Sequence, residues 1–457
     1  MIGRSDFLCI AIACAAAALL LAGLWTTGLL AGATAPDTAS YFLPLQSGQP
    51  WSEMRHPLYG FLAQALGGVG NAHVIALAQA AFHVLAALLL YGGARAGGIG
   101  ATGALALTLA ALFSQSGIYH LRLILPESPA ISALIVAFAG TLAATKSGAA
   151  FRLLILPVAL AAGCAYLLRP SFLPAIVVLP ALWYLLARRN AGGIADAWRA
   201  VLLLALIAAP FAVQSAYRWQ TVGDFNIVSF GGFSMSGLAG FMLTPELIPA
   251  LPEPIRPTAQ AVLAAREAGE AAGLVERTPL NSLGVRSFVS AALGYFDIYA
   301  RSYDNLVWGE IIKLRGPSES WVAFNERLQA FAVATVVASP VRWAAWIAGA
   351  TSRLAGRMIV TNLPMVAALV VLAVVALVAF ARQTAPAAGG DVAATCFVAL
   401  AWLACTAPLI VLTTFPATRY IDTGAVLLPA VPAALVLALI HGMRRSPPAG
   451  ASGAVPR

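Results

Sequence analysis

The side chains of this sequence that could do chemistry are a few polar and ionisable groups at the ends of long apolar runs. They are Asp37, Arg55, His56, Glu127, Arg169, Arg419 and Tyr420. A carboxylate can take a proton from an attacking hydroxyl or cap a helix. An arginine can hold phosphate oxygens with two parallel donors or extend to lipid headgroups. The apolar runs around these residues decide where they lie.

The composition predicts a polytopic membrane protein. Of the 457 residues, 60% are hydrophobic and 10% are charged, which leaves too few charges for the surface of a soluble domain. A helix needs about 20 apolar residues to cross a membrane, and about ten runs satisfy this requirement. They are residues 7–35, 72–91, 98–119, 128–145, 153–168, 170–187, 200–217, 361–381, 393–414 and 423–440. The runs are unbroken, whereas a membrane β-strand alternates lipid-facing and lumen-facing residues, so we expect an all-α fold with large extracytoplasmic loops.

The distribution of basic residues predicts that both termini are cytoplasmic. With this orientation, nearly every short inside loop is basic. The inside cations are Arg95, Lys146, Arg152, Arg188, Arg189, Arg199, Arg382, Arg444 and Arg445. The alternative for the first run is a cleaved signal peptide, whose apolar core has only about 7 to 15 residues.

Two segments outside the membrane divide the chain into three parts. Residues 1–217 form an N-terminal transmembrane module with a first extracytoplasmic loop at about 32–71. Residues 218–360 form a large extracytoplasmic segment, and residues 361–457 form C-terminal spans and a cytoplasmic tail. Within the second part, residues 328–352 are apolar but interrupted by Pro340 and Arg342. We expect an interfacial helix there, because a further crossing would place the C-terminal cations outside.

Charge, cysteines and histidines argue against several kinds of site. The net charge of +9 follows mainly from the basic inside loops, and no stripe of cations interleaved with aromatics indicates nucleic-acid binding. The five cysteines lie within predicted spans without C-x-x-C spacing, and the histidines are scattered. The sequence therefore predicts no cofactor and no metal ligands, although a divalent metal stays open as an alternative.

Seven short strings occur in the order that they have in a known family. They are "PDTASYF" at 36–42, "RHPLYGFL" at 55–62, "LPESPA" at 125–130, "LLRPSFL" at 167–173, "GDFNIVSFGG" at 223–232, "SPVRW" at 339–343 and "FPATRYIDT" at 415–423. Together they resemble the membrane glycosyltransferases of the GT-C type. The chain is similar to the bacterial relatives of protein O-mannosyltransferases and of the aminoarabinose lipid A transferase, which take sugars from polyprenyl phosphate.

The resemblance implies a hexosyl or pentosyl transferase at the periplasmic face of a bacterial inner membrane. A sugar would pass with inversion from a polyprenyl-phosphate donor to a protein, lipid or glycan acceptor, with membrane lipids around the spans. Phosphate leaves as a stable anion and needs cations rather than an acid. The implied general base is Asp37. The implied substrate-binding residues are Arg55, His56, Glu127, Arg169, Arg419 and Tyr420. Many relatives carry two adjacent acids in the first loop, whereas Thr38 follows Asp37 here.

Other interpretations of the same residues stay open at this point. Asp37 suits a helix N-cap, Glu127 suits the first turn of a helix, and His56 suits a structural role. The arginines suit contacts with lipid headgroups. The alternative functions are a multi-pass transporter, a lipid flippase or a noncatalytic membrane scaffold. A transporter should carry ionisable groups near mid-membrane, whereas the acids here lie at the ends of the runs.

Overall fold

The computed structural model describes residues 4–48, 51, 54–191, 194–276, 298–381, 390–413 and 423–445. Within these ranges the chain is helical and contains no strand, only an isolated bridge between Ala33 and Leu123. The predicted all-α fold is thus confirmed for the described part of the chain.

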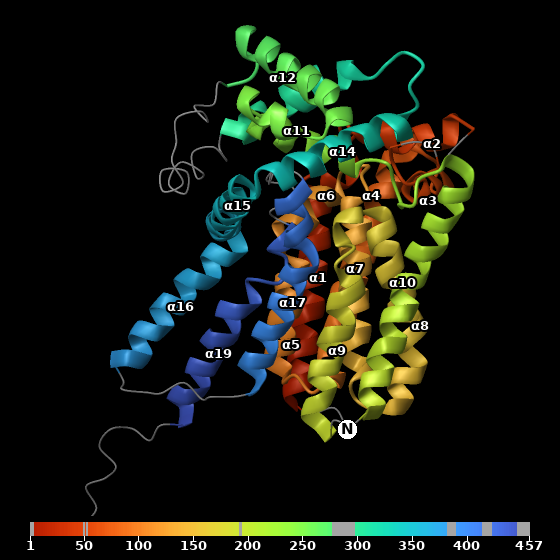
Figure 1. The fold of residues 1–457 in the computed structure, drawn as a ribbon. Helices are drawn as coiled ribbons and strands as arrows, with labels where there is room; N and C mark the ends of the chain where they lie inside the picture. Colours follow the sequence, from red (N-terminus) through yellow and green to blue (C-terminus); the bar gives the residue numbers. More distant parts are fainter. Residues whose placement is uncertain are drawn as a thin grey trace, which may run out of the picture.

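A bundle of roughly parallel helices forms one part of the molecule (Figure 1). Its helices are α1 (Arg4–Thr26), α4 (Ala72–Ala96), α5 (Ala101–Leu112), α6 (Gln115–Leu121), α7 (Glu127–Ala144), α8 (Gly148–Leu168), α9 (Ala175–Ala191) and α10 (Ile194–Val222), followed later in the chain by α16 (Leu363–Ala381), α17 (Gly390–Thr413) and α19 (Ala430–Arg445). Six helices of the described ranges are long and apolar enough to cross a membrane, and the number rises to eight if each of two bent pairs is one span. The last three predicted runs contain shorter apolar helices, at Leu363–Ala379, Val392–Pro408 and Ala430–Ile440.

Helix α7 lies at the centre of the bundle. In its most apolar window 78% of the residues are buried within the protein, compared with 17% in α10 at the periphery. Small residues allow α7 to approach α4 closely, since a Cβ on Gly93 would lie 2.2 Å from the carbonyl oxygen of Ala139. This central helix begins at Glu127, one of the predicted site residues.

The first helix ends earlier than the predicted run of residues 7–35. The hydroxyls of Thr26 and Thr27 hydrogen-bond to backbone carbonyls of the preceding turn, and Gly28 adopts a left-handed conformation with φ 70°. A glycine in this conformation is a common helix stop. The chain then forms the short helices η1 (Leu29–Ala31), η2 (Thr38–Tyr41), α2 (Leu43–Gln46), α3 (Leu58–Ala65) and η3 (Val69–Asn71) before α4 begins.

A second layer of helices, here called the cap, covers one end of the bundle (Figure 1). Its elements are α11 (Gly231–Met242), η5 (Pro245–Ala250), η6 (Glu253–Ile255), α12 (Arg256–Ala271), the π-helix η8 (Asn305–Glu310), η9 (Ile311–Leu314), α14 (Trp321–Ala338) and α15 (Pro340–Val360). Aromatic rings fill its core: the ring of Phe233 lies 4.8 Å from that of Trp308 and 5.2 Å from that of Trp321. The cap therefore has a hydrophobic core of its own, apart from that of the bundle.

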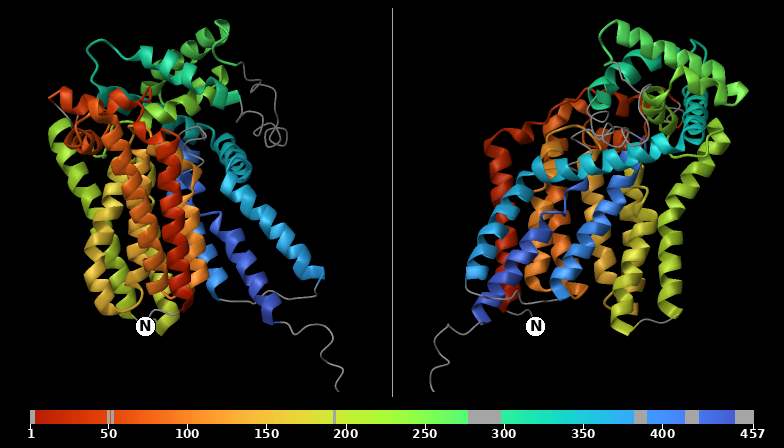
Figure 2. Two further views of the ribbon diagram at one scale, coloured as in Figure 1. Left: turned by 180° about the vertical axis from the view of Figure 1, so that it is seen from behind. Right: turned by 60° about the vertical axis from the view of Figure 1, so that its left-hand side comes forward.

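Helices α14 and α15 occupy the stretch predicted to be interfacial. The chain bends by 98° between them, at Pro340. Figure 1 shows α14 lying across the end of the bundle, and the second view in Figure 2 shows α15 crossing it as well. On α15 the buried residues Trp343, Trp346, Ala350, Leu354 and Met358 recur every three or four positions, as expected for a helix with one apolar face.

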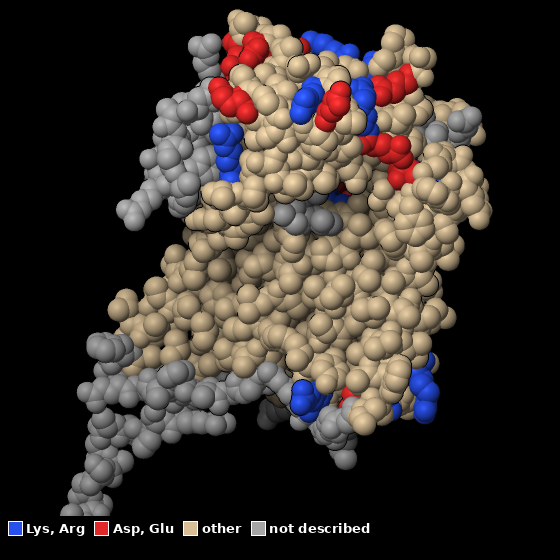
Figure 3. Space-filling model, in the orientation of Figure 1, with Lys and Arg blue, Asp and Glu red and all other residues tan. Residues whose placement is uncertain are grey.

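Charged residues gather at the two ends of the molecule. The space-filling view shows a belt largely free of Lys, Arg, Asp and Glu between the cap and the opposite end (Figure 3). The start of α1 lies at that opposite end, where Asp6 pairs with Arg95 and Asp196 pairs with Arg199. An apolar belt of this kind, with helices long enough to cross it, indicates a membrane-embedded protein.

Candidate functional site

One cavity at the junction of cap and bundle brings together five of the seven predicted site residues. It has a volume of about 280 Å³, and Asp37, Arg55, His56, Glu127 and Arg169 all line it. The other two, Arg419 and Tyr420, lie outside the described residues. The five residues come from the first loop and from the cap-side ends of α7 and α8. The fold thus collects side chains that lie up to 132 positions apart in the sequence, from 37 to 169.

Asp37 is held beside the start of α7 by hydrogen bonds of its neighbours. The Thr38 hydroxyl donates to the carbonyl of Ile124 over 3.1 Å and accepts from the Ala35 backbone N–H over 2.7 Å. Asp37 occupies the N-cap position of η2, but within the described chain its side chain makes no capping hydrogen bond. Its backbone carbonyl instead accepts from the Ser40 hydroxyl at 2.6 Å. The helix-cap interpretation therefore does not account for the carboxylate.

Arg55 connects the first loop to the cap. Its guanidinium carbon lies 4.9 Å from the ring centre of Tyr41 and 4.8 Å from that of Phe230, so the cation is held between two aromatic faces. Its Nε donates to the Ser40 hydroxyl over 3.3 Å. The arginine is thus fixed within the protein, in the wall of the cavity.

Glu127 and Arg169 form a buried ion pair at the cavity wall. Nη1 of Arg169 lies 2.8 Å from Oε1 of Glu127, and the residues are 7% and 4% exposed. Arg169 also donates from Nε to the Ser171 hydroxyl over 3.0 Å. Glu127 is the first residue of α7, where the helix dipole favours an acid, so the helix-start role and the ion pair coexist. The Arg169 head does not extend to the lipid surface, contrary to the headgroup alternative.

His56 is a neutral group in the same wall. Burial first, and then the positive charge of Arg218, lower the pKa of the imidazole to about 4. Nδ1 accepts the backbone N–H of Leu58 over 3.2 Å, which places the remaining proton on Nε2. The ring lies 5.7 Å from that of Trp51. At neutral pH this histidine can donate a hydrogen bond but carries no charge.

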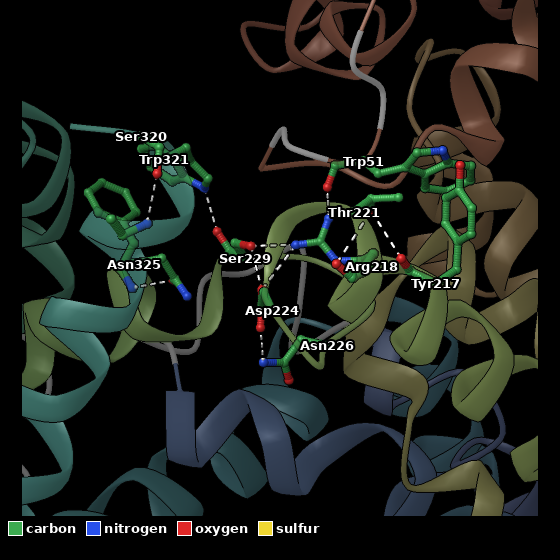
Figure 4. A network of polar contacts seen from close by, with 12 residues as sticks. Trp51, Tyr217, Arg218, Thr221, Asp224, Asn226, Ser229, Ser320, Trp321 and Asn325 are labelled. Carbon is green, nitrogen blue, oxygen red and sulfur yellow. Dashed lines mark hydrogen bonds and ion pairs between the residues drawn. The ribbon is translucent and has the colours of Figure 1, made fainter. Parts of the chain in front are cut away.

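Sequence reasoning missed a polar clamp next to the cavity, formed by Arg218, Asp224 and Ser229 (Figure 4). Arg218, which is 1% exposed, donates to the Trp51 carbonyl, to the Ser229 hydroxyl and to Asp224, 3.0 Å away. The Ser229 carbonyl in turn accepts from the indole of Trp321 on α14. The clamp ties the end of α10 to the first loop and to the cap. A charged pair six residues apart, just after an apolar run, was the available signal.

The cap adds neutral polar side chains that the sequence did not single out. These side chains also line the cavity, but they come from the cap and the segment leading into it, whereas the charged residues come from the first loop and the bundle. They are Asn226, Ser234, Asn325 and Gln329. Asn226 is fixed by a hydrogen bond from its Nδ2 to Oδ1 of Asp224 at 2.7 Å. The motif "GDFNIVSFGG" contains Asn226, but an isolated amide gives no sign of which ligand it faces.

A larger apolar groove adjoins this cavity along α14. Its volume is about 740 Å³, and its walls are formed by η5, η6 and one face of α14. Gln329 lines both spaces, so the groove and the cavity meet at this residue.

The side chains of the site are suited to acid–base catalysis and to anion binding. The described residues contain no group of three or more His, Cys, Asp or Glu side chains that could hold a metal ion. The cavity combines two carboxylates, two guanidinium groups and a neutral imidazole. No family model, curated protein or solved structure matches the chain.

Proposed function

We propose that the chain is a GT-C-type glycosyltransferase that moves a sugar from a polyprenyl-phosphate donor to an acceptor on the cap side of the membrane. The observation that carries the proposal is the single cavity lined by Asp37, Arg55, His56, Glu127 and Arg169. These residues come from four separate sequence strings and line one cavity, which supports a common role for them.

The proposed reaction assigns a role to each charged group. Asp37 accepts the proton of the acceptor hydroxyl as its oxygen attacks the anomeric carbon. The bond from that carbon to the phosphate oxygen breaks, and the phosphate leaves as an anion with its electron pair. Arg55, and Arg169 beside Glu127, offer positive charge to this leaving group. Attack opposite the phosphate inverts the anomeric carbon.

The membrane arrangement in this proposal is the one that the basic loops predict. Both termini lie in the cytoplasm, the cap lies in the periplasm of a bacterial inner membrane, and the shorter C-terminal helices complete about ten spans. The cavity would then lie near the periplasmic surface of the inner membrane, where a water-borne acceptor can reach a lipid-linked sugar.

The test is sugar transfer by the purified full chain in lipid nanodiscs. Decaprenyl phosphates carrying different sugars serve as donors, and an envelope extract serves as the acceptor source. Replacing Asp37 by Asn keeps the size of the side chain and removes the base, so we expect kcat/KM to fall by about 10²- to 10⁴-fold while donor affinity is retained.

The matched control is Asp304→Asn, because Asp304 is an exposed cap residue that does not line the cavity. This variant should transfer sugar like the wild type. Unchanged transfer by Asp37→Asn would show that Asp37 is not the general base. Absence of transfer by the wild type with every donor would contradict the proposed glycosyltransferase activity.

A further inference from the structure

The polar lining of the cavity is divided by origin. Every ionisable side chain of the lining, namely Asp37, Tyr41, Arg55, His56, Glu127 and Arg169, comes from the first loop or the bundle. The part of the lining that follows α10 contributes only neutral polar groups: Asn226, Ser234, Asn325 and Gln329. Within the described residues, the polar lining thus divides by its place in the chain into a charged set and a neutral set, here called the charged half and the neutral half.

Ser234 gives the clearest sign that the neutral half faces a ligand. The residue is 2% exposed, and its hydroxyl oxygen is buried without a hydrogen-bond partner in the described structure. The hydroxyl of Ser236 on the same helix is also buried, but it donates to the Phe233 carbonyl over 2.8 Å. A buried hydroxyl without a partner is unfavourable, and a ligand hydroxyl would remove this penalty.

The amides around Ser234 are oriented by the protein itself. Oδ1 of Asn325 accepts the backbone N–H of Phe233 over 3.1 Å, so the amide NH₂ is the group that Asn325 can offer to a ligand. Nδ2 of Asn226 bonds to Asp224, so its oxygen is the group on offer. Gln329 follows Asn325 by one helical turn on α14. The neutral half therefore offers both hydrogen-bond donors and acceptors, and a ligand hydroxyl can pair with either kind.

We infer that this neutral half is a binding subsite for an uncharged carbohydrate, and that Ser234, Asn325, Gln329 and Asn226 determine the specificity. A carboxylate or an ammonium group that faces these four side chains would lose hydration without meeting an opposite charge among them. The cavity volume of about 280 Å³ is close to the lower limit of about 300 Å³ for small-molecule sites. As a part of this cavity, the subsite holds no more than one monosaccharide unit. The inference rests on the proposed function and adds the class of sugar.

Binding rather than turnover tests the subsite. The probes are bare decaprenyl phosphate and decaprenyl phosphates carrying neutral sugars (glucose, mannose, galactose, arabinose), glucuronate or 4-amino-4-deoxyarabinose. The full chain in nanodiscs is titrated with each. We expect at least one neutral sugar to bind about tenfold or more tightly than the bare lipid phosphate and than both charged sugars.

The variant Ser234→Ala should lower affinity for that neutral donor about fivefold and leave affinity for the bare lipid phosphate unchanged. Ser236→Ala is the matched control, since it removes a buried hydroxyl of the same helix that bonds within the helix. Gln329→Met is a second variant, at a more exposed position, with the same expected selectivity.

The outcomes separate the subsite from the proposed function. Equal binding of bare and sugar-linked lipid phosphate, without Ser234-dependent binding of methyl glycosides, overturns the subsite while the polyprenyl-phosphate site stands. Tighter binding of a charged sugar overturns it as well. A failure to bind any polyprenyl phosphate overturns the proposed function, and the inference with it. In a separate titration, methyl glycosides are the probes. If Ser234→Ala weakens the binding of these probes alone, the subsite stands with the carbohydrate acceptor as its occupant.

Discussion

Single residues of the site show two ways of burying ionisable groups at low cost. Glu127 and Arg169 share their charges in a pair at 2.8 Å, which makes removal of either partner more harmful than removal of both. His56 instead stays uncharged, because burial and the neighbouring Arg218 disfavour its protonated form. Both devices keep polar side chains in the cavity wall without leaving an isolated buried charge.

The neutral His56 predicts a dependence of stability on pH. Its pKa falls from 6.5 in the unfolded chain to about 4 in the folded protein. The unfolded chain therefore binds the proton more readily between these values. Stability from His56 is complete above pH 6.5 and is lost as the pH falls towards 4, by up to about 3 kcal/mol.

The measurement is thermal unfolding in detergent at pH values from neutral to acidic. Relative to His56→Gln, the wild type should lose stability as the pH falls. His73→Gln removes an exposed histidine and is the matched control. Parallel curves for the wild type and His56→Gln would contradict the assignment of a neutral buried imidazole.

The sequence singled out most of the ionisable residues that line the cavity, but none of the neutral polar residues that the cap adds. Charged residues such as Asp37 and Arg169 are conspicuous at the ends of apolar runs, because burying them in lipid is costly. Asn325 and Gln329 lie in a helix that also carries Glu326 and Arg327, so nothing in the local pattern separates lining residues from exposed ones. Only the packing of α14 against α11 makes that distinction.

Among the elements, the contact between α11 and α14 fixes the neutral half of the cavity. A Cβ on Gly232 would lie 2.1 Å from the backbone oxygen of Asn325 and 2.7 Å from Cβ of Gln329. The Asn325 side chain also accepts the backbone N–H of Phe233 near the start of α11. The two helices can therefore approach closely only while residue 232 is a glycine.

Replacing Gly232 by Ala should separate these helices. The clash involves backbone, so relief requires movement of a whole helix, and we expect a loss of about 2 to 3 kcal/mol in stability. Affinity for a sugar-linked donor should fall more than affinity for the bare lipid phosphate. Thermal unfolding and the nanodisc titrations measure the two effects.

The matched control is Gly356→Ala on α15, where an added Cβ meets no atom within 4 Å. It should leave stability unchanged or raise it by up to about 1 kcal/mol, because alanine favours helix. Equal behaviour of the two variants would show that the α11–α14 contact tolerates separation.

The length of the apolar runs predicted most of the bundle helices, whereas the predicted end of the first helix was wrong. The run from 7 to 35 carries no charge, so the charge pattern gave no stop at Thr26. The stop depends on the left-handed conformation of Gly28 and on threonine hydroxyls that bond to the preceding turn. The bend between α14 and α15 was partly foreseeable, because Pro340 interrupts the apolar stretch there.

For the molecule as a whole, the proposed topology puts the cap on the periplasmic side of the membrane and the opposite end of the bundle on the cytoplasmic side. We expect Ser318→Cys, at an exposed turn of the cap, to react with a membrane-impermeant maleimide in intact spheroplasts. Ala149→Cys, exposed near the start of α8 at the other end of the bundle, should react only after permeabilisation. The wild type measures the background from its own cysteines.

The opposite labelling pattern would place the cap in the cytoplasm and invert the proposed topology. The number of spans has to be measured with further single cysteines between α14 and α19, because length and composition give six to eight spans within the described ranges. The sequence could not settle this number, since a broken helix pair and a true crossing have similar hydropathy.

The division of the cavity between bundle and cap has a consequence for how such a protein can diversify. The groups proposed to perform the transfer come from the first loop and the bundle, and most of those proposed to choose the sugar come from the cap. Substitutions in α11 and α14 can then alter which sugar is bound without disturbing the groups that catalyse its transfer. We expect descendants of one ancestor to differ mostly in these two helices, so that new substrates arise while the old chemistry is inherited intact.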